Sequence, residues 1–153
     1  KPVKVFSLPD PDAIEFVFLT LSDRSGNTVA ENFYVLSPEQ DVNDWQHGNW
    51  FLTPVSKPAN FKPLSTMPRA KVKTTVSRQG DTLTVEVRND SKHVAFFNRL
   101  AALDRKGQLY APAWWSDNYF SLRPGQSKTV TCRLPSEADA KAAKVTIECW
   151  NGK

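Results

Sequence analysis

Cysteine and histidine are scarce in this chain, with two of each among 153 residues. The sequence has no CxxC pair, no HExxH motif and no glycine-rich phosphate loop. His47 and His93 lie far apart and lack the spacing of a metal site or a catalytic triad, so we interpret both as surface or loop residues. The sequence therefore predicts no metal, no cofactor and no triad chemistry.

The two cysteines follow the same pattern. Cys132 and Cys149 each occupy the apolar parity of a strand-like stretch, so both side chains are predicted to point inward. Two outcomes stay open: a disulfide between them, or two buried thiols that pack as small hydrophobic side chains. We favour the two thiols.

Long apolar runs are also missing. No segment approaches the roughly 20 residues of a membrane span, and Lys1 opens no signal-peptide pattern. The chain does not begin with methionine, which suggests a piece of a longer polypeptide whose targeting signals lie elsewhere. The net charge is only +4, and the basic residues between positions 69 and 78 alternate with valine and threonine, as on a strand with one solvated face. We therefore expect neither a membrane nor a nucleic-acid partner.

Short apolar runs separated by turn signals make up most of the sequence. Two runs at residues 14–21 and 28–36 form a hairpin; the first is apolar on both faces, so we expect cover on both sides. Such a hairpin is not a stable domain alone and needs a sheet to join, either the C-terminal half of this chain or a second copy of the molecule. Regular alternation then predicts strands at residues 71–77, 82–88, 94–103, 108–114, 127–134 and 144–150. Ser136 is predicted to cap one helical turn over residues 136–143. This pattern predicts an all-β, antiparallel β-sandwich.

Residues 37–69 link the hairpin to the sandwich and show no regular pattern. We expect an extended connector that Trp45, Trp50, Phe51 and Phe61 pin to neighbouring surfaces. The chain thus divides into residues 1–36, 37–69 and 70–153. Alternation predicts these core residues: Leu83, Val85, Val87, Phe96, Leu100, Val130, Cys132, Val145 and Ile147, with Phe97 in place of Phe96 if a bulge shifts the strand.

The richest segment is the run WSDNYFSLRPG at residues 115–125, preceded by a second tryptophan. Its candidate contact residues are Trp114, Trp115, Asp117, Asn118 and Tyr119. Aromatic rings can cover the C–H faces of sugars, and amides and carboxylates can take the hydroxyls, but the same residues also serve cores and domain contacts. Glycoside hydrolysis would need a second carboxylate facing Asp117, and none is identifiable. We favour a structural or interdomain role over an open carbohydrate platform.

Two stretches resemble a known family. The run VAFFNRL at residues 94–100, together with the WSDNYFSLRPG run, resembles the C-terminal immunoglobulin-like region of glycoside hydrolase family 2, with exo-β-D-glucosaminidases and β-mannosidases as the nearest members. ENFYVLS at residues 31–37, DW at 44–45 and WFLTP at 50–54 look like the segment entering that domain. Two positions differ from the family: Gln126 stands where a glutamate is usual, and Val35 stands where an aromatic residue is common. Both differences weaken the choice of subfamily and leave the domain assignment unchanged.

The resemblance implies an immunoglobulin-like sandwich over residues 70–153, with the catalytic glutamates in a TIM barrel upstream and none here. Residues 1–36 would be the last strands of a preceding sandwich domain. The chain is then a non-catalytic accessory domain in oligosaccharide degradation, and the expected alternative is a carbohydrate-binding module that uses the loop at residues 115–119. Expected partners are the other domains of the enzyme, with oligosaccharide or a dimer through the hairpin at residues 14–36 as further possibilities. The resemblance also implies a periplasmic or extracellular location.

Overall fold

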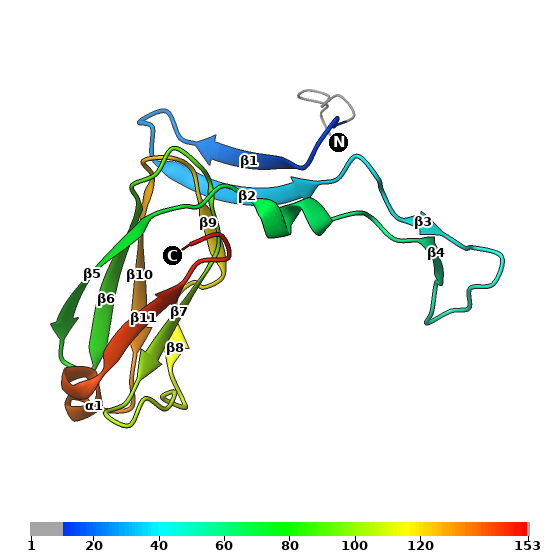
Figure 1. The fold of residues 1–153 in the computed structure, drawn as a ribbon. Helices are drawn as coiled ribbons and strands as arrows, with labels where there is room; N and C mark the ends of the chain where they lie inside the picture. The colour runs from blue at the N-terminus through cyan, green and yellow to red at the C-terminus, as the bar shows by residue number, and fades with distance from the viewer. Residues whose placement is uncertain (1–10, 153) are drawn as a thin grey trace. The chain divides into compact units, whose positions relative to one another are not determined.

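The computed structural model describes residues 11–152 and divides the chain into two compact units, with the boundary between Thr66 and Met67 (Figure 1). Strands dominate both units. The described residues contain a single α-helix, α1 (Glu137–Ala142), and none that is long and apolar enough to span a bilayer. The all-β prediction is confirmed.

The first unit begins with an antiparallel pair, β1 (Glu15–Ser22) and β2 (Thr28–Leu36). Their turn forms because the Asp23 carboxylate accepts hydrogen bonds from the backbone N–H groups of Ser25 and Asn27, at 2.8 and 2.9 Å. Among the described residues the two strands pair only with each other. Leu21 and Val29 remain more than 60% exposed. The predicted hairpin is confirmed, but the described residues of the first unit do not supply the cover that we expected on both faces.

The connector is more regular than the sequence indicated. It contains a second two-stranded sheet, β3 (Val42–Asn43) with β4 (Val55–Lys57), and the 3-10 helix η1 (Lys62–Thr66). Side-chain hydrogen bonds help to hold this sheet, because the Ser56 hydroxyl donates to the Val42 carbonyl at 2.9 Å. The rings that we expected to pin it to neighbouring surfaces are largely exposed among the described residues, namely Trp45, Trp50 and Phe51, so their contact with a neighbouring surface stays a prediction.

The second unit is a sandwich of two antiparallel sheets, seen as two layers in Figure 1. One sheet has the order β5 (Val72–Gln79), β6 (Thr82–Asn89), β10 (Ser127–Arg133) and β8 (Trp114–Trp115). The other has the order β11 (Lys144–Glu148), β7 (Ala95–Leu103) and β9 (Phe120–Leu122). The Ser136 hydroxyl accepts from the Asp139 backbone N–H at 3.1 Å, which confirms Ser136 as the N-cap of α1.

The core lies between these two sheets and follows the predicted alternation. Seven of the nine predicted residues are buried, namely Leu83, Val85, Val87, Phe96, Leu100, Val130 and Cys132. Val145 and Ile147 are partly buried against the same cluster. A bulge interrupts the pairing of β7 with β9 between Ala95 and Asn98 and gives Phe97 a left-handed φ of 52°. Because Phe96 is 8% exposed and Phe97 is 46% exposed, the bulge leaves Phe96 as the core residue.

One expected strand is mostly absent. Of residues 108–114, only Leu109 makes a bridge, to Leu103, before β8 begins at Trp114. Pro112 lies in this stretch and has no N–H to donate to a ladder. By contrast, residues 120–122 form β9 inside the segment that the sequence presented as a loop.

Candidate interaction surfaces

The loop between β8 and β9 carries the residues that the sequence singled out, and Asn118 fastens it to β7. The Asn118 side-chain carbonyl accepts the backbone N–H of Leu100 at 2.7 Å, and its amide donates to the Leu100 carbonyl at 2.9 Å. The same side-chain oxygen accepts the N–H of Tyr119 at 3.0 Å. The ladder between β7 and β9 ends at the pairing of Asn98 with Phe120, so Asn118 replaces the missing strand neighbour of Leu100. Both ends of this amide are therefore occupied by the sandwich itself.

Asp117 is engaged within the sandwich as well. One carboxylate oxygen accepts the Asn118 backbone N–H at 2.7 Å, and the other lies 2.6 Å from the Lys128 ammonium group. Lys128 lies on β10, the neighbour of β8, so the ion pair connects the loop to the sheet that contains β8. The Asp117 carboxylate therefore caps a turn and forms a surface ion pair. Neither of these contacts is with a second carboxylate.

The two adjacent tryptophans point in opposite directions, as expected for neighbours on a strand. Trp115 packs against the core and pairs with Cys132 of β10. The Trp114 ring is half exposed, and the Arg133 guanidinium lies over it at 5.0 Å from the ring centroid. Trp114 is thus covered on one face by a cation of its own sheet, and Trp115 is a structural residue.

Tyr119 belongs to a row of rings that sequence reasoning did not assemble. Its ring centroid lies 5.3 Å from that of Phe97, which lies 5.6 Å from Phe96, and Phe96 lies 6.3 Å from Trp150. Tyr119 and Phe97 are the non-glycine residues of the described chain with positive φ, at 58° and 52°. The only sequence signal for this row was the possibility of a bulge at Phe97. The ring planes are inclined to one another by 39° to 76°, so the row is not a flat platform.

Both cysteines are free thiols in the structure. Burial raises the pKa of the Cys132 thiol to about 11. Burial also raises the pKa of Cys149, whose sulfur donates weak hydrogen bonds to the Phe96 carbonyl and the Asn151 side-chain oxygen. Neither thiol has the lowered pKa of a nucleophilic cysteine.

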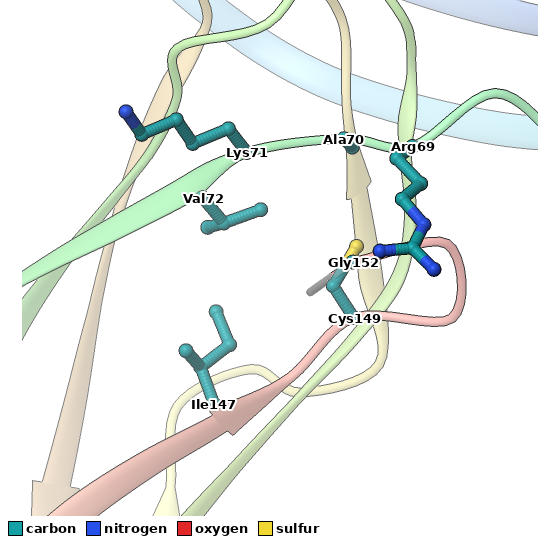
Figure 2. A pocket seen from close by; sticks show the side chains of 7 residues that line it. All are labelled: Arg69, Ala70, Lys71, Val72, Ile147, Cys149 and Gly152. Atoms are coloured by element: carbon teal, nitrogen blue, oxygen red, sulfur yellow. The ribbon is translucent and has the colours of Figure 1, made fainter.

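A pocket of about 460 Å³ opens between β5 and β11, the edge strands at one side of the two sheets. Figure 2 shows Val72 and Ile147 directed toward each other across it. Ala70, Cys149 and Gly152 also line the pocket, and Arg69 and Lys71 add two positive charges. The pocket is an apolar slot with a basic border, and none of its residues is placed as an acid, a base or an activated nucleophile.

The histidines do not gather other functional groups. His47 Nδ1 lies 2.7 Å from the Asp44 carboxylate, and the hydrogen bonds from the His47 side chain and backbone lower the pKa of Asp44. His93 contributes its backbone carbonyl to the Asn89 amide, at 2.7 Å. Across residues 11–152, no group of three or more histidine, cysteine, aspartate or glutamate side chains is arranged to hold a metal ion.

Comparison with known proteins gives a consistent result. A family model described as the exo-β-D-glucosaminidase Ig-fold domain matches residues 50–152. The chain is 39% identical over 123 residues to an exo-β-D-glucosaminidase of Arthroderma benhamiae, which covers 79% of this chain and 14% of that protein. It is 36% identical over 141 residues to the exo-β-D-glucosaminidase of Streptomyces avermitilis, with 87% of this chain and 16% of that protein covered. A crystal structure of the Amycolatopsis orientalis exo-chitosanase matches 98% of this chain and 19% of its own with a TM-score of 0.85 and 30% identity. The chain therefore spans about a sixth of the length of these curated relatives.

Proposed function

Because this chain belongs to the family of exo-β-D-glucosaminidase Ig-fold domains, we propose that it serves as a non-catalytic accessory domain of a larger glycosidase. The relatives are named for exo-β-D-glucosaminidase activity, so the substrate class that we propose for the whole protein is β-linked glucosamine oligosaccharide. The chain has an immunoglobulin-like sandwich and no catalytic barrel, so the hydrolytic step belongs to another part of that protein.

The observation that carries the proposal is the way in which the sandwich uses its own polar loop residues. The side-chain carbonyl and amide of Asn118 both hydrogen-bond to the backbone of Leu100. The Asp117 carboxylate accepts the Asn118 N–H and pairs with the Lys128 ammonium group. A carbohydrate platform would need these groups free for sugar hydroxyls beside exposed, similarly oriented rings. The contacts support a loop that stabilises the domain over one that recognises a ligand.

We propose that the β1–β2 hairpin completes the sheet of a preceding sandwich domain. Its two strands pair only with each other within the described residues, and apolar side chains such as Leu21 and Val29 are exposed. A two-stranded sheet is marginal in water, and its free edges are suited to strand addition. Deletion of residues 1–36 tests this against docking within the chain or across a dimer. If the hairpin belongs to a preceding domain, the oligomeric state and the stability of the remaining sandwich should not change. Loss of a dimer, or a less stable sandwich, would overturn the proposal and show that the hairpin docks on a second copy or on its own sandwich.

The function itself is tested by assay and by titration. We expect the 153-residue chain to release no product from aryl β-glucosaminides or β-mannosides, because among the described residues the contacts of Asp117 are with Asn118 and Lys128 and include no second carboxylate. Turnover that disappears on Asp117→Asn would overturn this. Glucosamine and mannose oligomers should leave the tryptophan fluorescence of the chain unchanged. Saturable binding that is lost on Trp114→Ala but kept in Asp104→Asn would instead identify a carbohydrate-binding module.

A further inference from the structure

The connector displays three large rings on the loop of residues 44–54, two of them at its tip and Trp45 near its base. Trp50 is 94% exposed, Trp45 is 75% exposed and Phe51 is 71% exposed. Leu52, beside them, is 55% exposed. Single exposed apolar residues are ordinary on a protein surface, but Trp50 and Phe51 contact each other, with ring centroids 5.0 Å apart, and four such residues in one short loop are typical of an interaction site.

The loop is held in one conformation by its own backbone and polar side chains. The Asp44 N–H donates to the Pro54 carbonyl at 2.8 Å, which closes the base of the loop. The Asp44 carboxylate accepts from the backbone N–H groups of Gln46 and His47 and pairs with the His47 ring. At the tip, the Asn49 side chain accepts from the N–H groups of Phe51 and Leu52, at 3.2 and 3.1 Å. The rings are therefore presented on a preorganised support, which lowers the entropic cost of binding.

We propose that this loop is a docking anchor that inserts Trp50 and Phe51 into an apolar hollow on another domain of the same polypeptide. The inference rests on the function proposed above, in which the chain is one domain of a larger enzyme. The curated relatives support such an occupant, because about five-sixths of their length lies outside the region that this chain matches.

The size of the surface favours a tethered domain over a second copy of the chain. Three rings exposed to this extent present on the order of 450 Å². Independent partners that associate stably bury about 800 Å² each. Contacts between domains of one chain extend down to about 600 Å² in total, because the covalent link removes most of the cost of association. With an equal area on the other domain, the ring surface would bury about 900 Å² in total, which is enough for a contact between domains of one chain, whereas its own area of about 450 Å² falls short of what each independent partner buries.

The geometry also favours protein over sugar as the occupant. The rings of Trp50 and Phe51 meet edge to face, with centroids 5.0 Å apart and planes at 83°, so they form no flat stacking surface. The carboxylate of Asp44 and the side-chain carbonyl of Asn49 are occupied by the turns of the loop itself. A wedge of two perpendicular rings fits a protein hollow, as tryptophan anchors do at the centre of interfaces.

The test compares one substitution in two contexts. The first is the 153-residue chain. The second is the Streptomyces avermitilis exo-β-D-glucosaminidase with its matching segment replaced by this chain. Trp50→Ala should lower the melting temperature of the chimera by about 3 °C or more and leave that of the chain within about 1 °C, because Trp50 is exposed only in the chain alone. Trp50→Phe retains a ring and should recover part of the loss.

Trp115→Ala is the matched control, because the Trp115 ring packs against the core of its own sandwich and its loss should cost the same in both contexts. A folded and active chimera that is unaffected by Trp50→Ala overturns the anchor and leaves the proposed function standing. A chimera that loses turnover on Trp50→Ala without any change in melting temperature also overturns it, because the ring then contacts substrate. A wild-type chimera that does not fold or turn over overturns the proposed function and this inference with it.

Discussion

Replacing Asn118 by alanine tests whether the loop between β8 and β9 is a structural clamp. The change removes three hydrogen bonds, two to Leu100 and one from the Tyr119 N–H. Each bond contributes about 0.5–1.5 kcal/mol net, and a buried backbone group that loses its partner costs about 1–3 kcal/mol. Leu100 is 2% exposed, and the neighbouring strand β9 ends before it, so water replaces the amide poorly there. We expect Asn118→Ala to lower the free energy of unfolding by about 2–4 kcal/mol.

Two companion variants separate this clamp from general damage to the loop. Asn118→Asp keeps the size and the acceptor but sets a carboxylate oxygen against the Leu100 carbonyl, so its loss should be at least as large as that of the alanine variant. Asp117→Ala removes an ion pair with Lys128 on the surface, together with one local turn contact, and should cost about 1 kcal/mol or less.

The measurement is urea unfolding followed by far-ultraviolet circular dichroism, with midpoints compared at a common slope. If Asn118→Ala stays within about 0.5 kcal/mol of wild type, the loop is not clamped to β7. The argument for a structural loop, and with it the main support for the accessory role, is then refuted.

Three further changes test other parts of the sandwich. Trp115→Ala should cost about 3–5 kcal/mol in the same unfolding experiment, because the ring packs on the core; a neutral result would make it a surface ring. The Cys132 thiol should resist iodoacetamide at pH 8 in the folded chain and react once urea unfolds it, since burial raises its pKa to about 11. Because the folded chain favours the neutral thiol, the raised pKa contributes to the free energy of unfolding fully below pH 9, and this contribution should be lost between pH 9 and pH 11. A profile of that free energy against pH should show the loss in the wild type, and Cys132→Ala should abolish it. Gly152→Ala would bring a methyl group 2.8 Å from Cys149 Cβ, and the turn must open to relieve the clash. We expect the free energy of unfolding to fall by about 1 kcal/mol, the value of the hydrogen bond from the Gly152 N–H to the Cys149 carbonyl that would be lost. An unfolding midpoint equal to or above that of the wild type would contradict this crowding.

The sandwich core was predictable because its signal is local. Leu83, Val85 and Val87 alternate with polar residues, and one face of a strand is buried whenever two sheets pack. Phe96 and Phe97 show where this reasoning stops. Two adjacent residues of equal hydrophobicity do not indicate which of them faces the core. Only the bulge in β7 decides which ring is buried.

The polar contacts that lock the sandwich could not be read in the same way. Asn89, Asn98 and Asn151 are buried, although asparagine is ordinarily a surface residue. Asn151 accepts the Phe96 N–H and donates to the carbonyls of Pro68 and Val94, which lie far from it in sequence. Such a role depends on which backbone groups a sheet leaves unpaired at its ends, and this is fixed only when the strands are placed in register. For the same reason the sequence suggested a turn cap for Asn118 but not its clamp on Leu100.

The first unit poses a different problem, because its side chains were identified correctly but their surroundings were not. The apolar pattern of β1 predicted burial, and the rings of the connector predicted contact, yet Leu21 and Trp50 are exposed. A pattern of hydrophobicity states that a surface avoids water without stating what covers it. The cost of leaving it exposed is the same for a core residue and for an interface residue, about 25 cal/mol per Å² of apolar area. The sequence predicted cover for these side chains and left several surfaces open as its source. If the cover is another domain of the same polypeptide, as we propose, the exposed hairpin and the ring-bearing loop are two parts of one requirement. Substitutions at either should then act on the stability of the larger protein more strongly than on the stability of this chain.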